Sequence, residues 1–315
     1  MALLNTDFKS LELANNVIIE DFGSQKIEMN DLDSSVVFRG GLYLYKIGIH
    51  DSSNNKALNS WLSFVLYAGL LKFRFKKTRF KINLGLNLRD YYQNIKYYLS
   101  VKRQKKLSYV SDEKEISKTL EIIGIEIYPN IFASAVTLSK VIQDRKFIVL
   151  KFGLEDFEGI YFDPTLEKEK QTYILGEGLS DHVEELQYAG PEKVKDYIIN
   201  KNNLAIDAKL KKQVAQYFKN QIERKINRIV GSNVDISIVL ITEEGISSYI
   251  GNVLLNNIKI GNVLEIVNQA NTIASEGLYL IDNFETIDSY NEKVGVAIAN
   301  NKTNFTSRKN RFTQD

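Results

Sequence analysis

One strand–turn–strand pattern occurs twice in this sequence, and each copy has a Phe-Gly pair at its turn. The first copy covers residues 16–29, with Phe22-Gly23 between two apolar stretches. The second covers residues 147–162, around Phe152-Gly153. Short apolar runs bounded by glycine are typical of β-hairpins. Since the pattern restarts after a helical segment, the sequence predicts an internal duplication of one α/β unit.

The remaining apolar periodicity predicts alternating helices and strands. We expect helices at residues 57–73, 89–99, 131–142, 181–188, 192–199, 208–229 and 246–255, and strands at residues 36–39, 42–49, 80–86, 107–110, 119–128 and 236–241. A chain of 315 residues has room for about two domains. We therefore expect one α/β lobe at 1–146 and a second at 147–282, with 283–299 returning to the first. Residues 300–315 are polar and basic, and we expect a disordered tail there.

Composition excludes several classes of protein and site. The chain has no cysteine, so disulfides, thiolate zinc sites and cysteine nucleophiles are excluded. Its two histidines, His50 and His182, lack neighbouring ligands, and we expect both to be surface residues. The longest apolar run, residues 61–71, is about half of a membrane span. The N-terminus shows no signal-peptide pattern, so we expect a cytoplasmic protein with no membrane partner.

Six short motifs follow one another in an order that resembles the actin-like fold, and within it the ParM family of plasmid-segregating filament proteins. They are Asp21-Phe22-Gly23-Ser24 and residues 43–48, 83–91, 125–130, 235–245 and 269–279. The first is similar to the family's first phosphate loop, residues 125–130 to the strand before its catalytic Glu or Gln, and residues 235–245 to its adenosine loop.

The resemblance implies a duplicated, ribonuclease H-like α/β fold with two lobes, a central cleft, ATP and Mg²⁺ as cofactors, and head-to-tail filaments. It places nucleotide-binding residues at Asp21, Gly23, Ser24, Gly153 and Gly245, and Asn130 at the catalytic position. For the first loop, a phosphate cradle and a plain tight hairpin both fit the residues.

Five features depart from the family's pattern. Lys151 replaces a metal-facing aspartate, Leu154 replaces a glycine, and Asn130 replaces a Glu or Gln. The adenosine loop reads Thr242-Glu243-Glu244-Gly245, and Glu28 replaces a lysine. Because phosphate loops need exposed backbone N–H groups and carboxylates for Mg²⁺, we expect weak or absent ATP hydrolysis. Lys151 either neutralises a phosphate in place of a metal or is a solvated or salt-bridged lysine beside Glu155 or Asp156.

Positive charge is concentrated in one segment. Residues 72–106 contain twelve Lys or Arg and one acid, whereas the whole chain has a net charge of only +2. This segment predicts a contact with a polyanion or an acidic neighbouring subunit. The residues proposed for it are Lys72, Arg74, Lys76, Lys102, Arg103, Lys105 and Lys106. A solvated face is the third alternative.

Two functions follow from these features. The first is a ParM-like protein that forms head-to-tail filaments in plasmid or phage DNA segregation, or in a related bacterial cytoskeletal role. The second is a nucleotide-free pseudo-actin that serves as a scaffold or binds DNA or a partner through residues 72–106. The expected partners are therefore the protein itself and DNA or an adaptor protein.

Overall fold

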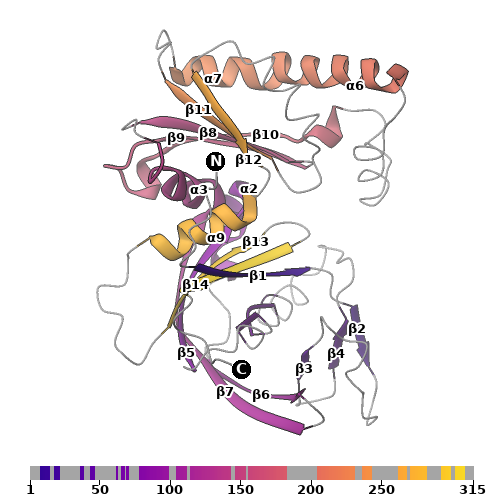
Figure 1. Cartoon of the computed structure of the whole chain (residues 1–315), viewed down its shortest axis with the longest axis vertical. Coiled ribbons are helices and arrows are strands. Elements are labelled where there is room, and N and C mark those ends of the chain that lie inside the picture. Colours follow the sequence, from indigo (N-terminus) through magenta and orange to yellow (C-terminus); the bar gives the residue numbers. More distant parts are fainter. Residues whose placement is uncertain are drawn as a thin grey trace. The chain divides into compact units, whose positions relative to one another are not determined.

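The computed structural model describes two compact units, each built around a β-sheet (Figure 1). Unit 1 comprises residues 1–86, 90–128 and 275–315, and unit 2 comprises residues 87–89 and 129–274. The residues whose structure is described are 8–14, 18–21, 36–38, 43–46, 62, 65–67, 69–70, 78–98, 104–111, 114–142, 146–153, 155–182, 204–230, 236–242, 262–267, 270–281, 292–298 and 302–308. The units therefore divide near residues 129 and 275, whereas the sequence pattern predicts boundaries at residues 147 and 283.

Unit 2 contains a five-stranded sheet with the order β10-β9-β8-β11-β12. Strand β8 runs antiparallel to β9 and parallel to β11. Strand β10 is antiparallel to β9, and β12 is parallel to β11. The bounds are β8 Phe147–Phe152, β9 Asp156–Phe162, β10 Thr172–Glu177, β11 Ser237–Thr242 and β12 Asn262–Val267. The predicted hairpin at residues 147–162 and the strand near 236–241 are both confirmed.

Helices complete unit 2. Helix α3 (Asn130–Leu138) packs against β8 and β9. The predicted helix at 208–229 is present as a continuous helical stretch: α6 (Leu204–Tyr217), a π-helical turn (Phe218–Ile222) and α7 (Glu223–Val230). Short 3-10 turns lie at Lys168–Lys170 and Leu179–Asp181. All six residues of β8 are buried, as expected for a central strand with neighbours on both sides.

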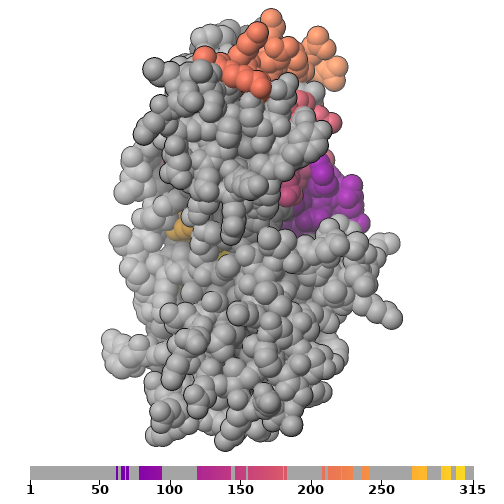
Figure 2. All heavy atoms as spheres, turned by 90° about the vertical axis from the view of Figure 1, so that its right-hand side faces the viewer, coloured from indigo at the N-terminus to yellow at the C-terminus, as the bar shows by residue number. Residues whose placement is uncertain are grey.

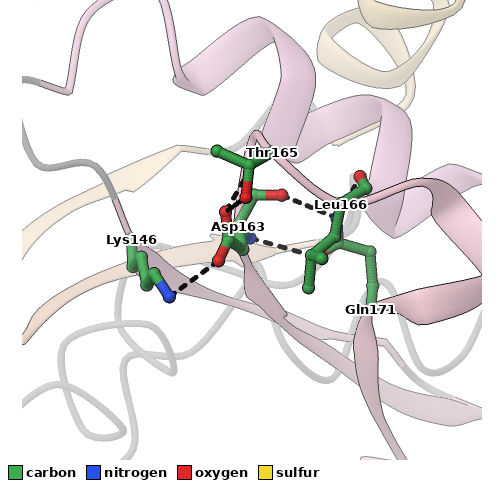
Figure 3. A network of polar contacts seen from close by, with 5 residues as sticks. All are labelled: Lys146, Asp163, Thr165, Leu166 and Gln171. Atoms are coloured by element: carbon green, nitrogen blue, oxygen red, sulfur yellow. Dashed lines mark hydrogen bonds and ion pairs between the residues drawn. The ribbon is translucent and has the colours of Figure 1, made fainter.

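The open end of the β8–β9 hairpin is held by polar contacts (Figure 3). Lys146 Nζ lies 2.7 Å from Asp163 Oδ2, and Thr165 donates two hydrogen bonds to Asp163 Oδ1. Gln171 Nε2 donates to the carbonyl oxygens of Asp163 and Leu166. The lysine and the hydroxyl lower the pKa of Asp163 to about 2. This network fixes the loop that leads from β9 to β10.

Unit 1 contains a six-stranded sheet with the order β1-β14-β13-β5-β7-β6. The bounds are β1 Phe8–Ala14, β5 Arg79–Leu86, β6 Gln104–Ser111, β7 Lys114–Pro129, β13 Glu292–Ile298 and β14 Lys302–Arg308. A separate three-stranded sheet contains β2 (Ile18–Asp21), β4 (Tyr43–Lys46) and β3 (Val36–Phe38). Helices α2 (Leu88–Tyr98) and α9 (Ala270–Leu280) each span a boundary between the units along the chain.

The expectation of a disordered tail at residues 300–315 is wrong for residues 302–308. These residues form β14, which lies between β1 and β13. Thr303, Asn304, Thr306 and Ser307 are all buried, so a polar sequence does not mean exposure here. Ser275 and Thr306 hydroxyl oxygens lie 2.7 Å apart, which shows how a buried hydroxyl on this strand is satisfied.

Candidate functional site

The turn end of the β8–β9 hairpin brings four charged side chains together in unit 2. Lys151 on β8 lies directly opposite Glu158 on β9, and its Nζ atom is 3.5 Å from Glu158 Oε2. The lysine side chain is 5% exposed and the glutamate side chain 0%. A buried ion pair is costly to desolvate, so each charge depends on the other and on further hydrogen bonds.

The residues at the start of α2 provide those further contacts. The backbone N–H of Leu88 donates a short hydrogen bond to Glu158 Oε1. An N–H at a helix N-terminus has no partner within its own helix, and a carboxylate is a favourable acceptor for it. Arg89 lies 2.6 Å from Asp156 Oδ1, so the second carboxylate of the hairpin also faces a cation.

The backbone of the turn is itself held by hydrogen bonds. Gly153 N donates to Asp156 O at 2.9 Å, which closes the turn. Leu179 N donates to Gly153 O, and Gly178 N donates to Glu155 O. The turn is therefore anchored to the 3-10 segment that follows β10, and the N–H of Gly153 is already used.

Lys151 forms an ion pair with a residue that the sequence analysis does not name. The sequence predicts a pair with Glu155 or Asp156, whereas the structure pairs Lys151 with Glu158. The reason is register, because residues directly opposite on antiparallel strands have neighbouring side chains. The signal was available in the sequence: a hairpin that matches Phe152 with Phe157 must also match Lys151 with Glu158.

The other predicted site residues are only partly described. Asn130 is the first residue of α3 and is 2% exposed. Asp21 is the last residue of β2. Lys105 and Lys106 lie on β6, opposite Leu120 and Thr119 on β7. The predicted residues outside the described part of the chain are Gly23, Ser24, Glu28, Leu154, Glu243, Glu244, Gly245, Lys72, Arg74, Lys76, Lys102 and Arg103.

Two cations of the basic segment are paired. Arg79 Nε donates a hydrogen bond of 3.0 Å to Glu121, and Arg89 pairs with Asp156. Each of these two arginines therefore already faces a carboxylate. The interpretation of the segment as a contact surface now depends on its other cations.

The charged cluster does not fit Mg²⁺. A magnesium site needs oxygen ligands with an excess of negative charge, and here a lysine or an arginine compensates each carboxylate. In the described part of the chain, no group of three or more His, Cys, Asp or Glu side chains is placed to hold a metal ion. We therefore derive no metal-dependent step from this hairpin.

A second feature of unit 2 is a pocket of about 350 Å³ beside α6. It is lined by His182, Lys209, Lys212, Gln213, Gln216, Tyr217 and Asn220. Figure 2 shows that side chains of α6 and α7, in orange, reach the surface. Its lining includes two exposed lysines, Lys209 and Lys212, beside the buried Tyr217. Sequence reasoning did not find it, because its residues come from two distant segments.

The wall of this pocket is ordered by Tyr217 and His182. The Tyr217 hydroxyl donates to Glu177 O at 2.8 Å, and its ring lies 4.8 Å from the His182 ring. His182 Nε2 lies 3.2 Å from Glu177 Oε2, and the histidine side chain is 23% exposed. Burial, followed by the nearby charges of Asp181, Glu177 and Asp156, raises the pKa of Tyr217.

Comparison with known proteins establishes the fold. No family model and no curated protein matches the sequence. Solved structures do match: the apo psk41 ParM protein (13% identity, 84% of this chain and 88% of that chain, TM-score 0.56), the archaeal actin homolog Ta0583 (14%, 82% and 89%, 0.53) and the Alp12 filament structure (16%, 84% and 87%, 0.53). The chain therefore has an actin-like α/β fold, as its ordered motifs predict. None of the helices in the described part of the chain is long and apolar enough to cross a membrane.

Proposed function

We propose that this protein forms head-to-tail filaments, in plasmid or phage DNA segregation or in a related bacterial cytoskeletal role. Its fold is shared with the ParM protein and with the Alp12 protein, whose structure is that of a filament. A repeated head-to-tail contact that does not close generates a filament. The partner in this assembly is a second copy of the same chain.

We further propose that this assembly does not depend on Mg-ATP hydrolysis. The observation that supports this is the buried Lys151–Glu158 pair, which places an ammonium group where the resemblance predicts a metal-facing carboxylate. The charge of Asp156 is compensated by Arg89, so this carboxylate provides no excess negative charge to bind a metal ion. A hairpin whose charges are already compensated by neighbouring groups has little to gain from Mg²⁺ or from a phosphate chain.

Sedimentation and negative-stain microscopy test this proposal. The purified chain is treated with EDTA and apyrase to remove metal and nucleotide, then examined with and without added Mg-ATP. We expect the same polymer yield in both conditions and no phosphate release. Assembly that appears only with Mg-ATP, with phosphate release, would contradict the proposal. A chain that pellets in neither condition would contradict filament formation itself.

The basic segment supports a second function, a scaffold that binds DNA or an adaptor protein. Its excess of eleven positive charges is unmatched elsewhere in the chain. Replacing Lys102, Arg103, Lys105 and Lys106 with Ser removes four of these charges. If the segment binds DNA, a mobility-shift titration will show a smaller decrease of affinity with salt for the variant. If it contacts another subunit, the variant will lose polymer, and DNA will not affect wild-type assembly.

A further inference from the structure

Four neighbouring strands have the same order and the same relative directions in the two sheets. In unit 2, β8 is parallel to β11 and antiparallel to β9, and β9 is antiparallel to β10. In unit 1, β13 is parallel to β5 and antiparallel to β14, and β14 is antiparallel to β1. Beyond β11 the unit 2 sheet ends with β12, whereas beyond β5 the unit 1 sheet continues with β7 and β6. Strand β13 thus corresponds to β8, β14 to β9, and β1 to β10.

The order of these strands along the chain differs between the units. In unit 2 the hairpin β8–β9 precedes the other three strands, whereas in unit 1 the corresponding hairpin β13–β14 follows all of them. We propose that unit 1 is circularly permuted relative to unit 2, so that the hairpin Glu292–Arg308 forms the first two strands of its sheet. This inference goes beyond the proposed function and does not depend on it.

Strand register supports the permutation. In unit 2 the antiparallel pair β9–β10 begins with Tyr161 opposite Thr172, and residues 163–171 join the two strands. In unit 1 the pair β14–β1 begins with Arg308 opposite Phe8, although 300 residue numbers separate them. The end of β14 and the start of β1 are therefore neighbours in space, as in a hairpin whose loop has been opened.

Packing shows that the unit 1 core is shaped around this hairpin. A Cβ atom on Gly69 would lie 2.1 Å from Cζ of Phe305 on β14, so only glycine leaves room for that ring. A Cβ atom on Gly295 of β13 would lie 2.2 Å from the carbonyl oxygen of Ser275 on α9. The hydrogen bond between the Ser275 and Thr306 hydroxyls joins α9 to β14 as well.

The permutation also changes which residues correspond to the candidate site. The counterpart of the β8–β9 turn is the connection Ala299-Asn300-Asn301, which contains neither glycine nor a carboxylate. Within the described residues, β2, which ends at Asp21, pairs with β4 in a separate sheet. Strand β2 therefore does not belong to the unit 1 sheet that corresponds to the sheet of unit 2.

Introduced cysteines test the register, because the natural chain has none. In the variant Phe8→Cys/Arg308→Cys, the two residues are directly opposite on antiparallel strands, within the Cα separation that a disulfide spans. The matched control is Phe8→Cys/Lys302→Cys, since Lys302 lies opposite Ala14 at the other end of the strand pair. We expect an intramolecular disulfide in the first variant only. No disulfide there, or equal yields in both variants, would overturn the proposal.

A variant in which the strands of unit 1 follow one another in the same order as those of unit 2 provides a second test. Residues 283–315 are placed before residues 1–282, which joins β14 to β1 through residues 309–315 and 1–7. We expect the same circular dichroism spectrum and one cooperative urea transition with an unchanged midpoint. Loss of cooperative unfolding would contradict the permutation. Neither test involves filaments or nucleotide, so their failure is distinguishable from failure of the proposed function.

A double-mutant cycle tests the packing in the unaltered chain order. We expect Gly69→Ala to lower the urea midpoint, and Phe305→Ala to remove most of that effect when the two are combined. Gly176→Ala is the control, because its added Cβ would meet the flexible end of Lys225 at 2.8 Å. Independent effects of Gly69→Ala and Phe305→Ala would show that β14 does not lie against Gly69.

Discussion

The hairpins β8–β9 and β13–β14 occupy the same place in two sheets but are held in different ways. At the turn end of β8–β9, the ion pairs Lys151–Glu158 and Arg89–Asp156 bring four charges together. Strand β13 is buried throughout, and its Gly295 lies against the backbone of α9. One position in a fold can thus be stabilised by charge pairing or by close backbone packing, and the two solutions respond to different perturbations.

The largest expected effect on stability comes from replacing a glycine by alanine in each hairpin. Gly295→Ala would place a methyl group 2.2 Å from Ser275 O and 2.5 Å from Tyr279 N, and a helix backbone cannot move aside locally. We expect a loss of about 4 kcal/mol in the free energy of unfolding. Gly159→Ala on β9 would meet only side-chain atoms at 3.1 Å, from Ile174 and Leu150, so we expect about 1 kcal/mol. Urea denaturation measures both, and equal losses would contradict this difference.

Two buried lysines provide the next comparison. Lys151→Met leaves the buried Glu158 without its cation, and we expect a loss of about 3 kcal/mol. The double variant Lys151→Met/Glu158→Gln should recover much of it, because no buried charge remains. Lys293 on β13 donates instead to the neutral Ile281 O, which also accepts from Asn83 Nδ2 at 3.2 Å. Lys293→Met should therefore cost about 1.5 kcal/mol. Urea denaturation of all three variants checks this order, and a larger loss for Lys293→Met would reverse the comparison.

The hairpin β8–β9 can be predicted from the sequence because the pattern that indicates it lies within one short segment. An apolar run, a glycine and a second apolar run are enough to indicate two strands and a turn. The Lys151–Glu158 pair also follows from that hairpin once its register is known. The Arg89–Asp156 pair does not, because it joins residues 67 positions apart and requires the tertiary structure.

The C-terminal hairpin could not be predicted in the same way. The β14 sequence KTNFTSR is polar apart from Phe305, and hydropathy favours an exposed tail. Its buried Thr306 is tolerated because Ser275, on a different element, supplies a hydrogen-bond partner. The pattern of polar and apolar residues does not show which distant residue forms a hydrogen bond with a buried polar side chain. The glycine that accepts Phe305 lies at position 69, far away in the sequence.

Helix α9, which packs against β13, contains a buried glutamate that makes the stability of the fold depend on pH. Glu276 on α9 is 3% exposed, and burial raises its pKa to about 7. Protonation therefore stabilises the fold: this stability is fully present below about pH 4, the pKa of an unfolded glutamate, and is lost as the pH rises through 7. Glu276→Gln imitates the protonated form, so we expect it to be about 2 kcal/mol more stable than the wild type at pH 8. Thermal denaturation from pH 5 to 8 checks this, and a wild-type stability that rises over this range would contradict it.

The smallest expected effect concerns the open ends of the two hairpins. In β8–β9, Lys146 and Thr165 lower the pKa of Asp163 to about 2, so the stability from this contact is present above about pH 4. It is lost as the pH falls from 4 through 2, and Asp163→Asn should reduce this acid sensitivity. In β13–β14, the corresponding link is the hydrogen bond of 3.1 Å from Ser307 Oγ to Lys293 O, which carries no titrating charge. Ser307→Ala should therefore lower stability by the same small amount at every pH. Acid titration of the two variants followed by circular dichroism measures the difference, and parallel curves for Asp163→Asn and the wild type would show that the ion pair does not hold this end of the hairpin.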